Sequence, residues 1–395
     1  MLVGIHANAS PTYDIQQKKG KTSIPFKLYN NIIIADLEIN GKTLQFIFDS
    51  GCKSTIILHP MWLDSFQIES RKKLYFVGLG VKDSVEMIKL NNATLKLGAL
   101  FGQNIPVFIL SKDSINLEKY LGINVDGIFG AELFEKYYVH LNFKKRQIEL
   151  FEKKPKKKIK SAYTKLPITI RNSKGYTSCV LMNDNNEVYT SELLFDTGAN
   201  ISLIIKNVSP EDLHIHKYID AEIGEGLAGA MYSKISRVHQ LFVDTFKFKN
   251  VIAAYSDVYS INNKHDEYDL DGNIGNDILF RFDAYFAYPE NAIYLHPNKH
   301  YNDIFDLNIS NIILLENKTK NYGFVVKSVT ESSAPSIAGL QKGDEIIKID
   351  NHKSSTIDLE DALYLLNRKI GKKINIQFLR NDVLYKINYK INRII

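Results

Sequence analysis

Apolar and polar residues alternate in short runs along most of the chain before residue 300. Residues 31–40 and 42–49 are two such runs, and Asn40-Gly41 between them is a strong signal for a two-residue β-hairpin. Residues 176–182 and 187–196 repeat the arrangement around a polar turn. Because no long stretch with a 3.6-residue period occurs in this region, the pattern predicts mainly β-structure.

The return run of each predicted hairpin ends on an acid, and a hydroxyl residue and a glycine follow it. Asp49-Ser50-Gly51 and Asp196-Thr197-Gly198 lie 147 positions apart (196 − 49). Further on, similar segments begin at Asp126 and Asp271, which are 145 positions apart (271 − 126). The near agreement of the two offsets indicates an internal duplication of about 150 residues, since self-similarity at a fixed period marks repeated units.

In each half, a third matching segment lies between the first and the second. Gly78-Leu79-Gly80 and Gly224-Glu225-Gly226 are separated by 146 positions (224 − 78). Three ordered matches at nearly one offset are hard to obtain by chance. We therefore predict two β-rich halves, and each half presents an acid at the end of a strand.

Such a duplication would bring two carboxyl groups together, and ionising both would then be energetically costly because their charges repel. One proton is then shared, so the charged member can accept a proton from water while the neutral member donates to a carbonyl oxygen. In this hypothesis Gly51 and Gly198 let backbone amides approach the acids, and the Ser50 and Thr197 hydroxyls fix the loops. The alternative is structural, because an Asp in such a turn often caps its own backbone.

The motifs resemble those of bacterial pepsin-like and retropepsin-like aspartic peptidases. That family carries Asp-Ser/Thr-Gly-Ala/Ser/Cys in each lobe, and both 49–52 and 196–199 fit. Two apolar residues and a glycine are expected later in each lobe, and Ile128-Phe129-Gly130 supplies them in the first. The second lobe departs from the pattern, because Asn273 stands where an apolar residue is usual.

The resemblance implies two fused β lobes around a cleft that binds an extended polypeptide substrate. It assigns Asp49 and Asp196 as the catalytic pair and makes Gly78-Leu79-Gly80 the candidate for a β-hairpin flap, with Gly224-Glu225-Gly226 as its counterpart. A plain hairpin turn is the alternative for both glycine segments. Since both acids belong to one chain, we expect a monomer that uses neither a metal nor another cofactor.

The pattern changes after residue 300. Residues 333–350 and a short helical segment at 358–367 precede two predicted strands within 372–391. This arrangement resembles a bacterial-type PDZ domain of α+β class. PDZ domains bind chain ends by strand addition, and the resemblance places a C-terminal peptide at Gly323, Phe324 and Val325. The alternative is a PDZ domain that serves only as a packing or docking module.

The predicted fold is therefore a mainly β, bilobal aspartic-peptidase double β-barrel or sheet followed by a PDZ domain. The expected domains are lobe one at 1–152, lobe two at 161–300 and the PDZ domain at 315–395. The basic run 152–160 joins the lobes, and we interpret it as a solvated linker.

Composition excludes several other classes. The net charge of +6 is modest and there is no basic face interleaved with aromatic residues, so nucleic acid is not an expected partner. The sequence has no apolar run long enough to span a membrane. His214 and His216 lack companion ligands at metal-binding intervals. Cys52 and Cys179 are expected to be buried free thiols.

Ala7-Asn8-Ala9 resembles the end of an export signal, which weakly favours a periplasmic or secreted protein over a cytoplasmic one. The functional hypotheses are an aspartic endopeptidase with a docking PDZ domain, or a catalytically silent peptide-binding or adaptor protein on the same scaffold. The enzyme is favoured because both acids, both glycines and both hydroxyls are intact.

Overall fold

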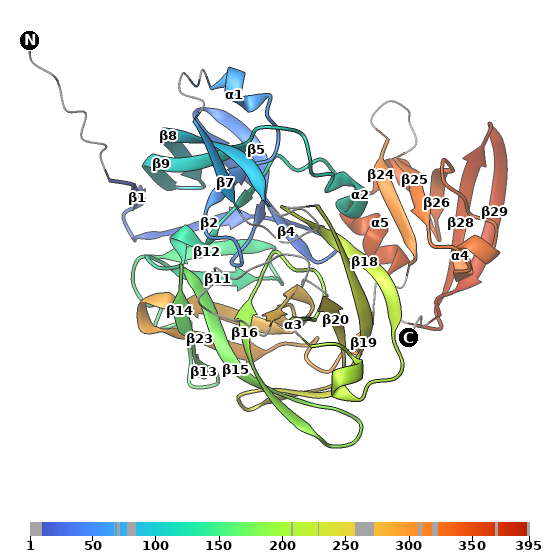
Figure 1. Cartoon of the computed structure of the whole chain (residues 1–395). Helices are drawn as coiled ribbons and strands as arrows, with labels where there is room; N and C mark the ends of the chain where they lie inside the picture. The colour runs from blue at the N-terminus through green and yellow to red at the C-terminus, as the bar shows by residue number, and fades with distance from the viewer. Residues whose placement is uncertain are drawn as a thin grey trace, which may run out of the picture.

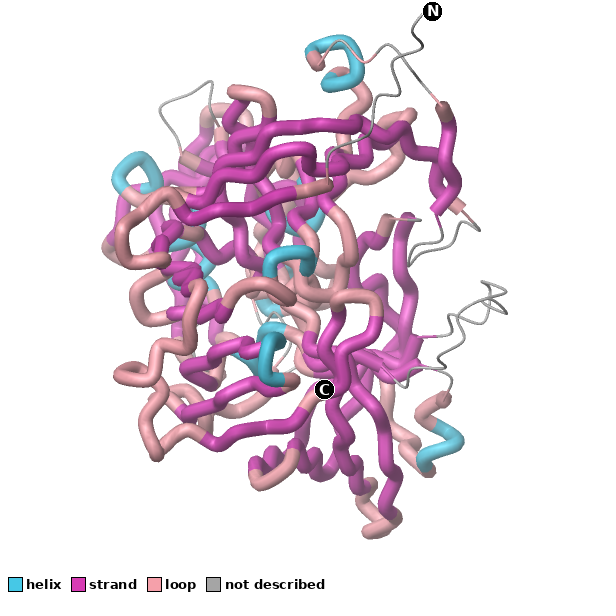
Figure 2. The backbone as a smooth tube through the Cα atoms, turned by 90° about the vertical axis from the view of Figure 1, so that its left-hand side faces the viewer, coloured by secondary structure: helices cyan, strands magenta, loops and turns pink. Residues whose placement is uncertain are grey.

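The computed structural model describes residues 10–66, 68, 72–76, 84–206, 208–227, 229–256, 272–306, 310–317, 323–367 and 370–392. In these ranges the strands form four sheets (Figure 1). Strands dominate the backbone and helices are short (Figure 2), so the predicted mainly β fold class is confirmed. No described helix has the length and apolar character needed to cross a membrane.

The sheet of lobe one has strand β10 near its middle. β10 runs parallel to β5, with Phe129 opposite Phe48, and antiparallel to β6, with Gly127 opposite Ile57. β6 in turn runs parallel to β9. The strands described in this sheet are β1 (Thr12–Ile15), β3 (Lys27–Tyr29), β4 (Ile32–Ile39), β5 (Lys42–Phe48), β6 (Thr55–Ile57), β7 (Lys73–Phe76), β8 (Val85–Leu97), β9 (Leu100–Leu110) and β10 (Gly127–Phe129).

The sheet of lobe two repeats these pairings. β21 runs parallel to β16, with Ile274 opposite Phe195, and antiparallel to β17, which runs parallel to β20. The duplication inferred from the sequence therefore has a structural counterpart in strand order. The strands described here are β14 (Thr169–Arg171), β15 (Lys174–Met182), β16 (Val188–Phe195), β17 (Leu203–Lys206), β18 (Ile219–Gly226), β19 (Gly229–Val243), β20 (Phe246–Ser256) and β21 (Gly272–Ile274).

Both hairpins expected from the alternating pattern are present. In lobe one, β4 pairs with β5, and Ile39 faces Lys42 across the turn. Asn40 and Gly41 have φ angles of 48° and 79°, which is the left-handed backbone that a tight hairpin of this kind requires. In lobe two, β15 pairs with β16 over the corresponding segment.

A third sheet joins the two lobes. β11 from lobe one pairs antiparallel with β22 from lobe two, with Val139 opposite Phe286. One continuous hydrophobic core extends through both lobes beneath this sheet. The lobes are thus connected by backbone hydrogen bonds as well as by the chain. The described strands are β2 (Lys21–Pro25), β11 (Tyr138–Asn142), β12 (Gln147–Phe151), β13 (Thr164–Pro167), β22 (Phe282–Ala287) and β23 (Ala292–Pro297).

The basic segment between the lobes is only in part the solvated linker that the sequence suggests, since four of its six lysines are exposed. Lys158 pairs with Glu149 at 2.8 Å, and Lys154 pairs with Glu290 at 2.8 Å. The Lys154 ammonium also lies over the ring of Tyr294. Lys154 and Lys158 therefore fold back onto the joining sheet, because acids on it offer them partners. Glu149 lies on β12, and Glu290 lies in the 3₁₀ turn between β22 and β23.

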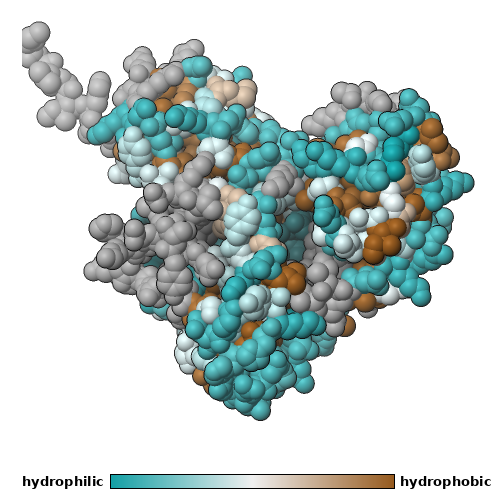
Figure 3. Space-filling view, turned by 45° about the vertical axis from the view of Figure 1, so that its right-hand side comes forward, coloured by the Kyte–Doolittle hydropathy of each residue, from teal (hydrophilic) through white to brown (hydrophobic). Residues whose placement is uncertain are grey.

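The C-terminal unit has its own sheet. Its described strands are β24 (Ile312–Glu316), β25 (Phe324–Val329), β26 (Glu345–Ile349), β27 (His352–Lys353), β28 (Lys373–Arg380) and β29 (Val383–Lys390). The predicted helix is present as α5 (Leu359–Leu366), and Asp358 accepts a hydrogen bond from Asp361 N–H at its start. Exposed apolar residues gather on this unit (Figure 3), including Ile337, Tyr364 and Leu384.

The described helical elements are short. The α-helices other than α5 are α1 (Trp62–Ser65), α2 (Glu118–Leu121), α3 (Asn276–Leu279) and α4 (Ala334–Ile337). The 3₁₀ turns are η1 (Ala131–Leu133), η2 (Glu211–Leu213), η4 (Tyr288–Glu290) and η5 (Ser354–Thr356).

The prediction that a chain end adds to the PDZ unit at Gly323, Phe324 and Val325 is wrong in its placement. β25 is paired on both sides at these positions, since Phe324 faces Glu316 of β24 and Ile346 of β26. Phe324 is also 2% exposed. Strand addition needs a free sheet edge, so it cannot take place there.

The edge strand β24 lies against lobe one (Figure 1). Residues of both units form one apolar cluster, which includes Ile34 and Leu121 of lobe one and Leu314 and Leu359 of the C-terminal unit. An ion pair between Arg146 and Glu360, at 2.8 Å, borders the contact. The C-terminal unit is therefore packed onto the lobe.

Gly122, next to α2, marks the tightest point of this contact. Its φ is +74°, and a Cβ atom there would lie 2.2 Å from the carbonyl oxygen of Leu314. We expect Gly122→Ala to lower the free energy of unfolding by about 3 kcal/mol, because a steric clash adds to the cost of a left-handed backbone. Urea denaturation measures the change.

Gly371→Ala is the matched control, because Gly371 has a φ of +78° and no atom lies within 4 Å of a Cβ there. It should cost only about 1–2 kcal/mol, the backbone part of the effect. Equal losses in the two variants would contradict a close contact between Gly122 and Leu314.

Candidate active site

Strands β5 and β16 each deliver an acid to the boundary between the lobes. The backbone N–H of Asp49 donates to the carbonyl of Phe129, and the N–H of Asp196 donates to that of Ile274, both at 2.9 Å. Each acid is thus held at the end of its strand by the parallel neighbour, β10 or β21. The matching distances follow from the matching strand order of the two lobes.

The two carboxyl groups approach each other across this boundary, and each lies against the glycine of the opposite motif. The glycine of each motif makes the approach possible. A Cβ atom on Gly51 would lie 2.6–2.9 Å from the carboxyl atoms of Asp196, and one on Gly198 would lie 2.4–2.7 Å from those of Asp49. Each lobe therefore needs a glycine to admit the acid of the other lobe.

The hydroxyl residues bind the two loops to each other. The N–H of Ser50 donates to Thr197 Oγ1 at 2.9 Å, and the N–H of Thr197 donates to Ser50 Oγ at 3.0 Å. Each hydroxyl then donates to a carbonyl of the opposite lobe at 2.7 Å, Ser50 to Phe195 and Thr197 to Phe48. Both side chains are fully buried. We call these four hydrogen bonds the crossed loop contact.

Backbone amides also hold the carboxyl groups. Asp49 Oδ1 accepts from the N–H of Gly51 at 2.6 Å and from that of Cys52 at 3.2 Å. Asp196 Oδ1 accepts from the N–H of Gly198 at 2.9 Å. These bonds hold each carboxyl group against the backbone of its own loop.

Asn273 adds a contact that the sequence did not indicate. Its side chain is 2% exposed, and its Nδ2 donates to Asp196 Oδ2. In the sequence this residue looks like a departure from an apolar pattern. In the structure it is a buried donor directed at one of the two acids.

Burial raises the pKa of Asp49 well above its usual range, and the charge and the hydrogen bond of Asp196 raise it further. The Gly51 amide and the charge of Lys174 oppose this shift. Asp49 keeps some access to solvent, while Asp196 is 7% exposed.

The long hairpin β18–β19 of lobe two reaches across to lobe one. Glu225 accepts a hydrogen bond from the backbone N–H of Asn116 at 2.9 Å, and Glu222 accepts one from the Tyr120 hydroxyl. Leu227, at the tip, packs on a lobe-one cluster. Sequence reasoning marked this hairpin by Gly224-Glu225-Gly226 but assigned no contact to Glu225 and did not single out Glu222 or Leu227.

The cluster beneath Leu227 borders the acid pair. It includes Phe76, Phe108 and Cys52, and Cys52 follows the Asp49 loop. Cys52 is partly buried and Cys179 fully buried, and both are free thiols. Burial raises the pKa of each thiol to about 12, so neither is a thiolate at neutral pH. The predicted flap residues Gly78, Leu79 and Gly80 lie outside the described residues.

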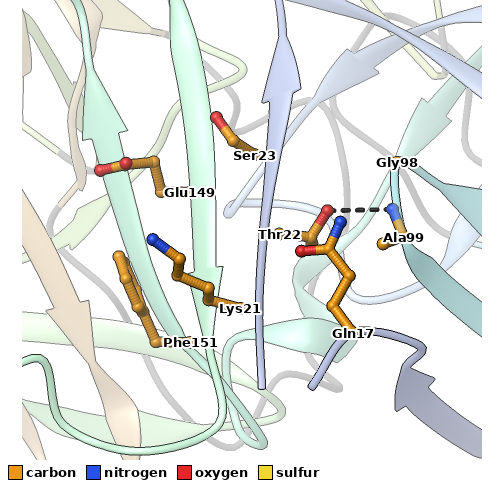
Figure 4. A pocket seen from close by; sticks show the side chains of 8 residues that line it. All are labelled: Gln17, Lys21, Thr22, Ser23, Gly98, Ala99, Glu149 and Phe151. Carbon is orange, nitrogen blue, oxygen red and sulfur yellow. Dashed lines mark hydrogen bonds between the residues drawn. The ribbon is translucent and has the colours of Figure 1, made fainter. Parts of the chain in front are cut away.

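Figure 4 shows a surface pocket, which has a volume of about 420 Å³. It is lined by Gln17, Lys21, Thr22, Ser23, Gly98, Ala99, Glu149 and Phe151. Neither Asp49 nor Asp196 lines this pocket, so it is not part of the candidate site.

The described residues contain no group of three or more side chains suited to hold a metal ion. His214, one of the two histidines considered from the sequence, contacts Glu187 at 2.7 Å.

Comparison with known families gives two matches. Residues 35–133 match the family described as aspartyl protease, and residues 311–391 match the PDZ domain. The predicted architecture of a peptidase unit followed by a PDZ domain is thus confirmed. The first match includes Asp49 and β10, and it ends before lobe two. No curated protein matches the chain.

The crossed loop contact predicts a stability effect. Thr197→Val leaves the N–H of Ser50 without its buried acceptor, so we expect a loss of about 1–3 kcal/mol in the free energy of unfolding. Thr197→Ser keeps the hydroxyl and should therefore lower the free energy of unfolding by less. In urea denaturation, Ser50→Ala combined with Thr197→Val should cost less than the sum of the single changes, since both residues serve one network. Strict additivity would argue against that network.

The raised pKa of Asp49 predicts a pH-dependent effect. A carboxyl group whose pKa is higher in the folded state destabilises the fold as pH rises above its unfolded value of about 3.9. Asp49→Asn should therefore increase the free energy of unfolding at pH 7 by an amount on the order of 1 kcal/mol, and this gain should disappear below about pH 4.

Thermal unfolding across this pH range tests the expectation. Asp36→Asn, at an exposed position on β4, is the control for removing one negative charge. A stability gain at pH 7 that is no larger for Asp49→Asn than for Asp36→Asn would contradict the expectation.

Proposed function

We propose that the protein is an aspartic endopeptidase in which Asp49 and Asp196 act together on a peptide bond. The family match supports a protease-like function at the coarser level. The observation that carries the finer proposal is the close approach of the two carboxyl groups, each supplied by one lobe.

The reaction follows from the shared proton. The charged carboxylate accepts a proton from a water molecule, and the oxygen of that water adds to the peptide carbonyl carbon. The neutral carboxyl group donates its proton to the carbonyl oxygen, which gives a neutral gem-diol. As the gem-diol collapses, one of its hydroxyl groups gives a proton to the charged carboxylate, the C–N bond breaks, and the nitrogen receives a proton from the neutral carboxyl group. No covalent enzyme intermediate is required.

An extended polypeptide is the proposed substrate. The acid pair lies where the two lobes meet, and the β18–β19 hairpin brings Leu227 onto the apolar cluster that contains Cys52 and Phe76. Apolar side chains beside a peptide bond would find matching surface there. One copy of the chain supplies both acids, so we propose that a monomer suffices.

We propose that the PDZ unit serves chiefly as a docking module of the peptidase. Its match to the PDZ family suggests peptide binding. However, β25 has no free edge at Phe324, and Leu314 of β24 contacts Gly122 of lobe one. A C-terminal peptide that adds beside β24 would have to displace this contact.

Activity is tested with an unstructured protein substrate between pH 3 and 7. Asp49→Asn and Asp196→Asn should each lower kcat by about 10²–10⁴-fold or more, because each removes one proton-transfer group. The crossed loop contact remains in both variants, so near-ultraviolet circular dichroism should confirm that they fold.

Equal cleavage by the wild type and both variants would reject the proposal and indicate a contaminating peptidase. Binding of the substrate without cleavage by the wild type would instead favour the catalytically silent peptide-binding protein.

A further inference from the structure

The two lobes place different residues at matching positions beside the acids. Asn273 of β21 lies opposite Leu194 of β16, and Ile128 of β10 lies opposite Ile47 of β5. In both cases the neighbouring strand leads directly to the acid. One acid therefore has an amide at this position and the other has a hydrocarbon. The duplicated halves are unequal at the point where proton transfer is proposed.

The orientation of the Asn273 amide is determined by its surroundings. Nδ2 donates to Asp196 Oδ2, and Oδ1 has no hydrogen-bond partner among the described residues. Beside a charged carboxylate, the reversed amide would direct oxygen lone pairs at the carboxyl oxygen, and it would lose the only hydrogen bond that the described structure gives the side chain. The N–H group is therefore the part of the amide that faces Asp196.

An N–H donor binds a charged carboxylate more strongly than a neutral carboxyl group. Asp196 accepts two such bonds, one on each oxygen, from Gly198 and Asn273. The bonds that Asp49 accepts from backbone amides fall on a single oxygen, Oδ1. Each acid thus accepts two N–H bonds, but only Asp196 is bound at both carboxyl oxygens and by a side-chain donor, and that difference comes from Asn273.

We propose that Asn273 is a positioning residue that makes Asp196 the charged member of the pair and leaves the shared proton on Asp49. In the reaction, Asp196 then accepts the proton of water and Asp49 donates to the carbonyl oxygen. This role rests on the proposed peptidase function. The pKa of Asp49, which burial and Asp196 raise, agrees with the assignment.

Other titratable groups act on the pair from several elements. Lys174 of β15 and the Asp49 loop residue Cys52 interact with Asp49, and Tyr288 of η4 interacts with Asp196. Substitution of Asn273 changes none of these groups. A change in the titration of Asp196 in such a variant is therefore attributable to the lost amide.

The first experiment measures kcat/KM against pH for the wild type and Asn273→Leu, which is nearly isosteric. Loss of the amide should move the acid limb upward by about one pH unit, the equivalent of one charged hydrogen bond. It should lower kcat about tenfold at a pH within that window, with little change in KM. Ile128→Leu, at the lobe-one counterpart, should leave the acid limb in place.

Asn273→Ala serves as a second variant, because it removes the donor without adding bulk to a buried site. The same upward shift is expected. A purely structural role would reduce folding or activity at every pH and would not displace the acid limb. An acid limb at the wild-type position in folded variants overturns the proposal.

A second measurement does not depend on activity. In protein labelled with ¹³C at the aspartate carboxyl groups, the Asp196 resonance is assigned by its loss in Asp196→Asn. Its titration midpoint should rise by about one pH unit in Asn273→Leu or Asn273→Ala. An unchanged midpoint overturns the proposed role of Asn273. A raised midpoint in a protein that does not cleave would uphold the charge assignment and reject the peptidase function.

Discussion

The site depends on the crossed loop contact between Ser50 and Thr197. Each hydroxyl accepts from the backbone of the other loop and donates to a carbonyl on the strand of the other lobe. Separating the lobes would leave these fully buried polar groups without partners, which is costly. This penalty opposes the repulsion between two neighbouring acids. The same residues that hold the lobes together thus hold the carboxyl groups in reach of each other.

The remaining architecture supports this point of contact. The joining sheet connects the lobes by backbone hydrogen bonds, and one core extends through both. Residues 116–129 of lobe one contact three other parts of the structure. Asn116 binds the β18–β19 hairpin, and Gly122 contacts the C-terminal unit. The carbonyl of Phe129 accepts the hydrogen bond from the backbone N–H of Asp49. The peptidase unit and the PDZ unit therefore share a common frame rather than being independent modules.

Duplication explains the similarity of the two halves, and a few substitutions explain their difference. Strand order, the acid, the hydroxyl and the glycine recur in each lobe. Asn273 does not recur, since its counterpart is Ile128. A symmetric pair would leave the shared proton without a preferred site. A single buried amide on one side is enough to distinguish the acids, because hydrogen bonds to charge are strong where water is scarce.

The sequence by itself determined the local features: the β-hairpins, the duplication, the two acids with their glycines, and the family of the C-terminal unit. These are properties of neighbouring residues, and turn chemistry and alternating burial record them directly. Only the tertiary structure decided that the hydroxyls cross between lobes, that the basic segment folds back in part on the joining sheet, that β25 has no free edge, and that Asn273 faces Asp196. Those contacts join residues far apart in the chain, so they depend on how strands pair and pack, which no local pattern specifies.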